Sequence, residues 1–194
     1  MKVLVACEYS GRVREAFRKL GHDAWSCDLL PSDDNSPYHI QGDVLGILND
    51  GWDMMIAHPP CTYLASSGLH WNKRIPGREQ LTVEALEFIE ALLSAPIPKI
   101  ALENPIGRIS TAIRKPDQII QPWMFGEDAS KSTCLWLKNL SKLEPTNIIK
   151  KERYANQTAS GQNKLAPSPD RWKLRSTTYQ GIANAMAEQW GKVV

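Results

Sequence analysis

Two short stretches of the sequence place a reactive type of side chain directly after a buried strand. Asp53 to Ala57 is an acid followed by four apolar residues, which predicts a short buried strand, and His-Pro-Pro-Cys61 follows it. The proline pair fixes φ and removes two backbone donors, so the strand ends there and Cys61 lies on a rigid loop. Only a thiolate attacks, and it needs stabilising neighbours. Cys61 is therefore a candidate nucleophile, with a small buried hydrophobe as the alternative.

The second stretch repeats this arrangement with a carboxylate. Lys99 to Pro105 is an apolar run that ends in Glu103, Asn104 and a proline. The carboxyl ends of neighbouring parallel strands meet at one edge of an α/β sheet, where ligands bind, so we expect Glu103 close to Cys61. A carboxylate there can hydrogen-bond a ring nitrogen while the thiolate attacks the same ring. Such a pair would activate a poorly reactive heteroaromatic substrate.

The first part of the chain has the pattern of a nucleoside-binding unit. Lys2 to Cys7 predicts a buried parallel strand, Glu8 to Gly11 a turn, Arg12 to Leu20 a helix, and Asp23 to Asp28 a second strand ending in an acid. The turn has one glycine where a dinucleotide-binding fold has three, so it suits a cofactor without phosphates whose ribose hydroxyls bind the final acid. An ordinary strand–helix–strand connection is the alternative.

The rest of the chain alternates between predicted loops, helices and strands. The expected elements are a polar loop over Leu29 to Gln41, an acid at Asp43 after a short strand or turn, a short helix from Val44 to Leu48, a loop from Ser66 to Arg78, a helix from Gln80 to Ser94, strands at Gln118 to Pro122 and Thr133 to Leu137 with a turn at Phe125-Gly126, an irregular stretch from Asn139 to Trp172, and a helix from Thr178 to Trp190. The mobile loop carrying Lys73, Arg74 and Arg78 is the expected lid over a site.

Composition bounds the class of protein. The 194 residues, 42% of them apolar, suit one domain with a full core. We expect no signal peptide and no membrane span, because no apolar run approaches the necessary length. The four cysteines are far apart without a Cys-x-x-Cys spacing, which argues against a zinc site and a disulfide framework and indicates a cytoplasmic protein.

Charge is unevenly distributed along the chain. Residues 138–194 carry ten Lys and Arg against four Asp and Glu, a net +6, whereas residues 1–137 carry a net −4. A basic last third indicates a polyanionic partner, with a solvated basic face as the alternative.

Six motifs, in order, resemble the cytosine-5 DNA methyltransferase family, in particular small, phage-like members with a reduced target-recognition region. The motifs are Ala6 to Gly11 for the S-adenosylmethionine loop, Asp28 for the ribose-binding acid, Gly42-Asp43 for the adenine-contacting acid, His58-Pro-Pro-Cys61 for the nucleophile, Glu103-Asn-Pro105, and Gln180 to Asn184 for the final motif. The resemblance covers nearly the whole chain, and the nucleophile and Glu-Asn-Pro motifs are its most specific part.

The resemblance implies an α/β, Rossmann-like S-adenosylmethionine-dependent methyltransferase fold, with a mostly parallel sheet flanked by helices. It implies that Cys61 adds to C6 of cytosine, that Glu103 engages N3 and the exocyclic amine, and that C5 receives the methyl group. A base within a duplex would have to be flipped out of the stack. We expect S-adenosyl-L-methionine as the cofactor, nucleic acid as the partner, most plausibly DNA, and the cytoplasm, that of a host if the protein is phage-encoded, as the location.

The residues that the resemblance and the motifs select fall into three groups. The expected catalytic residues are Cys61, Glu103 and Lys131; the expected cofactor-binding residues are Cys7, Glu8, Tyr9, Ser10, Gly11, Asp28, Asp43, Pro59 and Asn184; and the expected substrate-binding residues are Pro60, Asn104, Lys73, Arg74, Arg78, Arg171, Lys173 and Arg175.

The chain departs from the family pattern in two ways. The Gln-x-Arg-x-Arg motif is absent, and Lys131 stands near its place, although a lysine does not replace a bidentate arginine. The recognition region would be only a basic segment at residues 139–175, between a catalytic core at residues 1–138 and a C-terminal helix at residues 176–194 that completes it. Its lysines and arginines can grip phosphates but read little sequence, so we expect loose specificity, a short site or a substrate other than long duplex DNA.

Three alternatives stay open at the level of the sequence. The same chemistry could act on RNA or a free cytosine nucleotide. A non-catalytic nucleic-acid-binding protein could retain the fold. The transferred group could differ from methyl.

Overall fold

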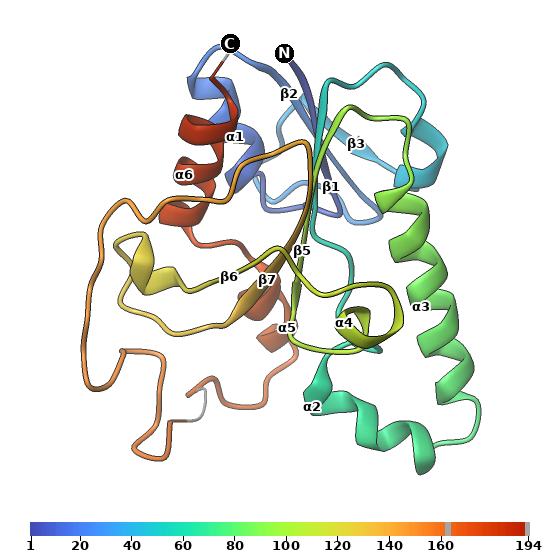
Figure 1. Cartoon of the computed structure of the whole chain (residues 1–194), viewed down its shortest axis with the longest axis vertical. Coiled ribbons are helices and arrows are strands. Elements are labelled where there is room, and N and C mark those ends of the chain that lie inside the picture. Colours follow the sequence, from blue (N-terminus) through green and yellow to red (C-terminus); the bar gives the residue numbers. More distant parts are fainter. Residues whose placement is uncertain (162–163, 193–194) are drawn as a thin grey trace.

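A seven-stranded, mostly parallel sheet forms the centre of the protein, in the order β3-β2-β1-β4-β5-β7-β6. The computed structural model describes residues 1–161 and 164–192 (Figure 1). The strands are β1 (Lys2–Ala6), β2 (Asp23–Asp28), β3 (His39–Gln41), β4 (Met54–Ala57), β5 (Lys99–Pro105), β6 (Gln118–Ile120) and β7 (Thr133–Lys138). β1 to β5 pair in parallel, and β7 runs antiparallel to both β5 and β6.

Helices cover both faces of this sheet. The α-helices are α1 (Arg12–Lys19), α2 (Ser66–Leu69), α3 (Arg78–Leu93), α4 (Ile109–Ala112), α5 (Arg171–Ser176) and α6 (Gln180–Trp190), and the 3-10 helices are η1 (Val44–Ile47), η2 (His70–Lys73) and η3 (Pro122–Met124). α1 and α6 lie side by side on one face, and α3 lies on the other (Figure 1).

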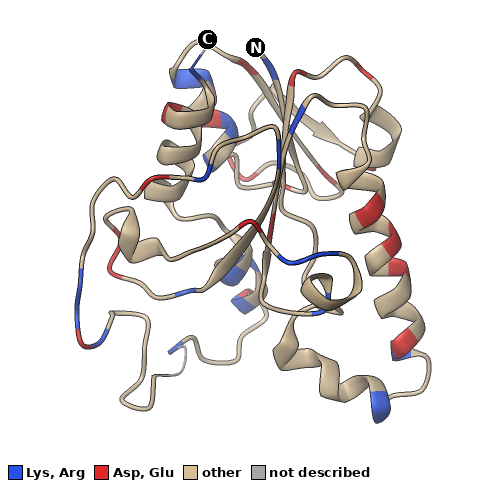
Figure 2. Cartoon of the chain, viewed as in Figure 1, with Lys and Arg blue, Asp and Glu red and all other residues tan. Residues whose placement is uncertain are grey.

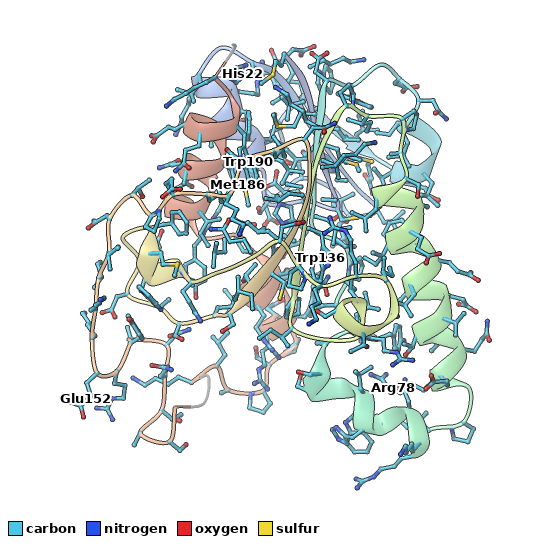
Figure 3. All side chains as sticks on the ribbon, in the orientation of Figure 1. His22, Arg78, Trp136, Glu152, Met186 and Trp190 are labelled. Carbon is cyan, nitrogen blue, oxygen red and sulfur yellow. The ribbon has the colours of Figure 1, made fainter. Side chains whose placement is uncertain are left out.

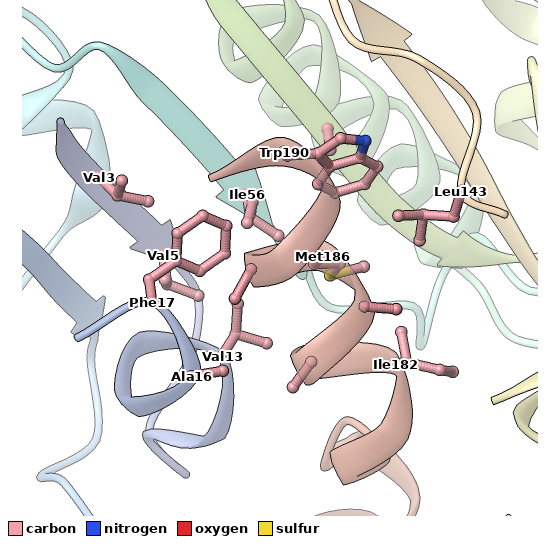
Figure 4. Packing of buried hydrophobic residues seen from close by; sticks show 14 of the residues in the cluster. Val3, Val5, Val13, Ala16, Phe17, Ile56, Leu143, Ile182, Met186 and Trp190 are labelled. Atoms are coloured by element: carbon pink, nitrogen blue, oxygen red, sulfur yellow. The ribbon is translucent and has the colours of Figure 1, made fainter. Parts of the chain in front are cut away.

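Alternation along the strands explains the two cores. In β1, Val3 and Val5 face α1 and α6, whereas Leu4 and Ala6 face α3. Both sets are fully buried, as a parallel strand between two helical layers requires. On the first face Phe17 and Met186 pack between the helices and the strands (Figure 4).

The carboxyl ends of β1, β2, β4 and β5 meet at one edge of the sheet. Figure 1 shows this edge opposite the two chain termini, with α2, α4 and α5 gathered around it. The chain moves outward from β1 to β3 and then returns to β4 on the other side of β1. Such a switch point opens a crevice between two strand ends, where open α/β sheets bind their ligands.

Several predicted elements are confirmed, and three are wrong. The first two strands and first helix lie within a residue of the prediction, and Gly21 ends that helix with φ +82°. The loop predicted at residues 29–41 ends in β3, which pairs with β2. The loop predicted at residues 66–78 instead forms α2 and η2, and α5 lies where no helix was expected.

The segment at residues 139–175 is irregular until α5, as expected, but its beginning packs on the core. Leu143 is buried against the α6 face, and the indole of Trp190 donates to the carbonyl of Ser141 at 2.9 Å. Residues 162–163 of this segment and residues 193–194 of the predicted C-terminal segment lie outside the described residues. The proposed boundaries of the segment stay predictions.

Within residues 1–161 and 164–192, no helix has the length and apolar character needed to cross a lipid bilayer.

Candidate functional site

Cys61 and Glu103 lie at the ends of adjacent parallel strands. β4 and β5 pair in register from Met54 opposite Lys99 to Ala57 opposite Leu102, so Glu103 is the next residue of β5 and Cys61 follows β4 on its loop. Cys61 is solvent-exposed, whereas the Glu103 side chain is 14% exposed. The two groups are close enough for the carboxylate to influence the thiol, as described next.

The pKa of Cys61 is raised above its ordinary value. Loss of hydration around the thiol is the main cause, and the negative charge of Glu103 adds to it. The positive charges of Lys131 and Arg175 act in the opposite direction. The resting side chain is therefore a thiol at neutral pH, and both a carboxylate and two cations surround the atom that would react.

Glu103 is held as a carboxylate by the groups around it. Burial raises its pKa, but this effect is exceeded by the hydrogen bond from His58, the charge of Lys131 and a hydrogen bond from Thr133, so the pKa is lowered overall. The His58 bond joins Nδ1 to Glu103 Oε2 at 3.0 Å. Glu103 is thus a carboxylate held by His58 and Thr133 beside the exposed thiol.

Lys131 reaches this site from the residues that precede β7. Its Nζ donates to the carbonyl of Arg175 at 2.8 Å, and its charge lowers the pKa of both Glu103 and Cys61. A small cavity of about 10 Å³ is lined by Glu103 and Thr133 of the sheet, by Lys131, and by residues before and within the first turn of α6. The prediction that Lys131 accompanies Cys61 and Glu103 therefore has geometric support.

The nucleophile loop is fastened to the strand that carries Glu103. Asn104, 1% exposed, donates from Nδ2 to the carbonyl of Pro59 at 2.9 Å. The amide of Arg108 donates to the carbonyl of Leu64 at 2.7 Å. Gly107 lies so close that an added Cβ would overlap the same Leu64 carbonyl. These contacts hold the loop of Cys61 against the strand of Glu103. The substrate-binding role predicted for Asn104 has no geometric support, because its side chain is buried and bonded to this loop.

A cavity of about 450 Å³ opens beside the Cys61 loop at the ends of β1 and β2. Its lining includes three acids, Asp28, Asp43 and Glu84, and apolar side chains from α3 and η1. Pro60 and Tyr63 of the nucleophile loop form another part of its wall. A volume of this size accommodates a drug-sized ligand such as a nucleoside derivative.

Two of the cavity acids, Asp28 and Asp43, already accept hydrogen bonds from backbone amides. Asp28 accepts a 2.9 Å hydrogen bond from the amide of Leu30, and its pKa is raised mainly by burial. Asp43 caps η1 through the amide of Leu45 at 2.9 Å. Cys7, with φ +58°, lines the cavity, and burial raises its pKa far above the usual value, with Asp28 contributing.

Glu8 serves the protein rather than the cavity. Its buried carboxylate accepts hydrogen bonds from the amides of Val13 at 2.7 Å and Arg14 at 3.2 Å. These amides belong to the first turn of α1 and therefore have no partner within the helix. Ser10 donates from Oγ to the same carboxylate at 3.4 Å. The prediction that Glu8 binds the cofactor is corrected accordingly. A carboxylate already occupies the positive end of the helix, where a phosphate would bind in a dinucleotide fold.

Other predicted cofactor residues also have different neighbours. Tyr9 turns toward α5, where its hydroxyl donates to the carbonyl of Lys173 at 3.2 Å. Gly11 has φ +72° and abuts the Arg14 side chain, so it shapes the turn. Pro59 is buried behind Pro60 and does not line the cavity.

Asn184 does not lie at the cavity. It is exposed on α6 and accepts a 2.9 Å hydrogen bond from Gln180, while its neighbours in sequence face the core. The cofactor role predicted for Asn184 has no geometric support.

The predicted substrate-binding cations lie on two sides of the site. Lys73 and Arg74 are exposed on and after η2, with Arg74 stacked 5.5 Å from the ring centroid of Trp71. Arg78, labelled in Figure 3 at one end of α3, donates to the carbonyl of Thr62 at 3.0 Å and lies over the ring of Tyr63. Arg78 therefore supports the nucleophile loop directly.

The second group is α5, whose Arg171, Lys173 and Arg175 follow one another at alternate positions. The helix is held over the site by Tyr9 and Lys131, as described above. Trp172, 50% exposed, packs against Tyr9 with ring centroids 5.9 Å apart. In Figure 2 basic residues gather at α5, whereas acidic residues follow the outer side of α3.

Three residues of the site were not predicted to have a role: His58, Gly107 and Tyr63. His58 is the first residue after β4, on the strand next to that of Glu103, and this position was the available signal. Gly107 follows Glu-Asn-Pro-Ile, and a glycine at a strand end is typical of close backbone approach. Nothing in the sequence marks Tyr63 as a cavity residue.

Comparison with known proteins bears on the fold. No model of a protein family matches the sequence, and no curated protein matches it. Among solved structures, the chain is similar to a crystal structure named as a candidate DNA modification methyltransferase encoded within a prophage (E. coli), with 16% identity and a TM-score of 0.50. The match covers 76% of this chain and 51% of the other, so this chain spans about half the length of that protein. The protein has an α/β, Rossmann-like fold of the methyltransferase type, with Cys61 and the 450 Å³ cavity at the same edge of the sheet.

Proposed function

We propose that this protein is an S-adenosyl-L-methionine-dependent methyltransferase that modifies C5 of cytosine in DNA through a covalent bond from Cys61 to C6. One observation carries the proposal. The exposed thiol of Cys61 lies beside the carboxylate of Glu103, which is hydrogen-bonded to His58. Pro60 and Tyr63, on the loop that carries Cys61, form part of the wall of the 450 Å³ cavity. A nucleophile, a base-binding carboxylate and a nucleoside-sized cavity are the parts that this reaction needs.

The cavity suits the cofactor by the chemistry of its donors. Asp28 can accept hydrogen bonds from ribose hydroxyls, and Asp43, at the N-terminus of η1, can accept a hydrogen bond from an adenine amine. The carboxylate of Glu8 at the first turn of α1 disfavours a pyrophosphate, so a cofactor without phosphates fits better. When bound, S-adenosyl-L-methionine supplies an electrophilic methyl group.

The residues of the chain perform the remaining chemistry. The thiol of Cys61 gives its proton to the carboxylate of Glu103, the thiolate adds to C6, the C5–C6 double bond opens, and Glu103 passes that proton to N3, where the negative charge arrives. The same carboxyl group accepts a hydrogen bond from the exocyclic amine. After methylation the N3 proton returns to Glu103, C5 loses its proton to water, and the electrons of that C–H bond restore the C5–C6 double bond as the thiolate leaves C6.

The surroundings of the site favour a polyanionic substrate that arrives from the side of α5. Arg171, Lys173 and Arg175 lie there, and the acidic outer side of α3 disfavours approach from the opposite side (Figure 2). Phosphate contacts of this kind provide affinity without sequence readout. The solved structure similar to this chain is named for DNA modification and comes from a prophage, which supports DNA as the substrate and a phage or mobile element as the source.

Methyl transfer tests the proposal. The protein is incubated with S-adenosyl-L-methionine labelled in the methyl group and with duplex DNA, single-stranded DNA, RNA or cytidine nucleotides, and the nucleosides are then analysed by mass spectrometry. We expect labelled 5-methyldeoxycytidine from DNA. Label at C5 in RNA or in a free nucleotide would show that the substrate is not DNA, while the proposed reaction at C5 would stand. Label at an exocyclic amine would refute the proposed reaction.

A further inference from the structure

His58 lies between the two halves of the site. It is the first residue after β4, and its backbone amide donates to the carbonyl of Ala6 at 2.9 Å, which joins the ends of β4 and β1. Its side chain is 6% exposed, and Nδ1 forms the 3.0 Å hydrogen bond to Oε2 of Glu103. A buried imidazole in this position contacts the acid that would face the base without facing the base itself.

The other ring nitrogen makes no such bond to a described residue. Nε2 of His58 is buried and has no hydrogen-bond partner among the residues that the structure describes. The imidazole is close enough to the buried carboxylate of Glu8 to lower its pKa, against the larger effect of burial. Glu8 in turn caps α1, the helix that follows the turn beside the cofactor cavity. His58 thus interacts with two carboxylates: that of Glu103, at the proposed base-binding position, and that of Glu8, in the turn before α1.

We propose that His58 is a positioning residue: its Nδ1–H holds the Glu103 carboxylate through Oε2, beside the hydrogen bond from Thr133, and so sets the direction in which this carboxylate faces the base. This inference rests on the proposed function and deepens it. Without this bond the carboxylate could rotate about its side-chain torsions and would lose its direction toward the base. Partners of this kind, which orient a reacting group from behind, are commonly worth 10 to 100-fold in activity.

Other charged and titratable groups also face Glu103. Lys131 approaches from the segment before β7, Cys134 lies on β7, and Cys61 lies on the loop after β4. Lys131 lowers the pKa of Glu103, as His58 does, so the two effects must be separated by variants. His58→Ala removes the bond, whereas His58→Asn keeps an N–H donor near the position of Nδ1.

The first measurement needs no activity. Protein with ¹³C-labelled glutamate carboxyl groups is titrated by NMR, and the Glu103 signal is assigned with Glu103→Gln. We expect the pKa of Glu103 to rise in His58→Ala and to stay close to that of the wild type in His58→Asn, because the hydrogen bond to the carboxylate is retained. His22→Ala is the matched control, since His22 lies far from the site (Figure 3) and should leave Glu103 unchanged. An unchanged Glu103 titration in His58→Ala would overturn the proposal.

The second measurement follows the rate of covalent adduct formation with DNA that contains 5-fluorocytosine. We expect His58→Ala to slow the maximal rate by about 10 to 100-fold while the Kd for DNA and for S-adenosyl-L-methionine changes little, and His58→Asn to recover most of the rate. Equal losses in both variants, together with a lowered Tm, would show a structural role only and overturn the proposal. If the wild type forms no adduct while its Glu103 titration still depends on His58, the proposed function fails and the positioning contact stands.

Discussion

The side-chain amide of Asn104 donates a 2.9 Å hydrogen bond to the main-chain carbonyl of Pro59 and so ties the strand of Glu103 to the loop of Cys61. Both groups are buried, so the bond is protected from water. Cys61 and Glu103 come from segments about forty residues apart in sequence. Their separation in space depends on this contact and on the close approach at Gly107.

Asn104→Ala should therefore lower activity more than stability. Loss of the bond leaves the Pro59 carbonyl buried without its donor, at a cost of about 1 to 3 kcal/mol in the free energy of unfolding. Displacement of the loop by a fraction of an ångström to one ångström should lower kcat by as much as about 100-fold. Asn139→Gly is the matched control, because Asn139 makes a similar 2.8 Å bond to the carbonyl of Pro98, and glycine tolerates its φ of +52°. Equal kcat values for Asn104→Ala and the control would contradict the assignment.

Gly107→Ala should separate the loop from the strand. An added methyl group would overlap the Leu64 carbonyl, which is backbone and cannot swing away. We expect loss of most methyl transfer, while binding of S-adenosyl-L-methionine, measured by calorimetry, is less affected. In the control Gly46→Ala the new methyl group meets nothing within 4 Å, and activity should be retained. Full activity of Gly107→Ala would show that the loop tolerates displacement.

Asp28→Asn should weaken cofactor binding without unfolding the protein. A hydrogen bond to a charged group contributes about 1.5 to 3 kcal/mol, which corresponds to a 10 to 100-fold increase in the Kd. The measurement is equilibrium binding of S-adenosyl-L-methionine, with Asp50→Asn as the control, since Asp50 is exposed and outside the cavity lining. An unchanged Kd in Asp28→Asn would place the cofactor elsewhere.

Substitution of the α5 cations should reduce the salt dependence of DNA binding. Each lost phosphate contact lowers the slope of log K against log salt by about 0.9 for duplex DNA. Arg171→Ala with Lys173→Ala should therefore flatten the plot, and Lys19→Ala, which removes an exposed charge at the end of α1, should not. An unchanged slope in the α5 variant would show that α5 does not contact the DNA phosphates.

The rate of adduct formation should rise with pH across neutrality. The pKa of Cys61 is raised, so the thiolate fraction increases up to and beyond the ordinary thiol pKa. Lys131→Met removes a charge that lowers this pKa, so the rise should move to higher pH, whereas Lys131→Arg retains the charge. A pH profile that is identical in wild type and Lys131→Met would show that Lys131 does not act on the thiol.

Much of the fold follows from the sequence because its signals are strong and local. The buried runs of β1, β4 and β5 have no polar interruption, and parallel strands between two helical layers need this pattern. α2, η2 and α5 span four to six residues each, too few for a helical period to appear, and Ser66 to Gly68 favours a loop on composition. These elements are fixed by tertiary contacts, such as the bonds from Asn72 to Glu79 and Thr82.

The site was predictable where topology alone brings residues together. Adjacent strand ends place Cys61 beside Glu103 and Asp28 near Cys7. The direction in which a side chain points is harder to predict from the sequence. Glu8, for example, caps α1 instead of facing the cavity. Asn184 could have been excluded from the sequence, because Ile182, Ala183 and Met186 form the inner face of the same helix and leave position 184 outside.

The central claim is that Cys61 bonds to C6 of a cytosine base. The direct measurement is incubation of the protein and S-adenosyl-L-methionine with DNA containing 5-fluorocytosine, because fluorine at C5 blocks the elimination that would release the enzyme. We expect a stable adduct, seen by mass spectrometry and mapped to the peptide of Cys61, that is absent from Cys61→Ala. Measurable cofactor binding without an adduct, or an adduct that persists in Cys61→Ala, would contradict it.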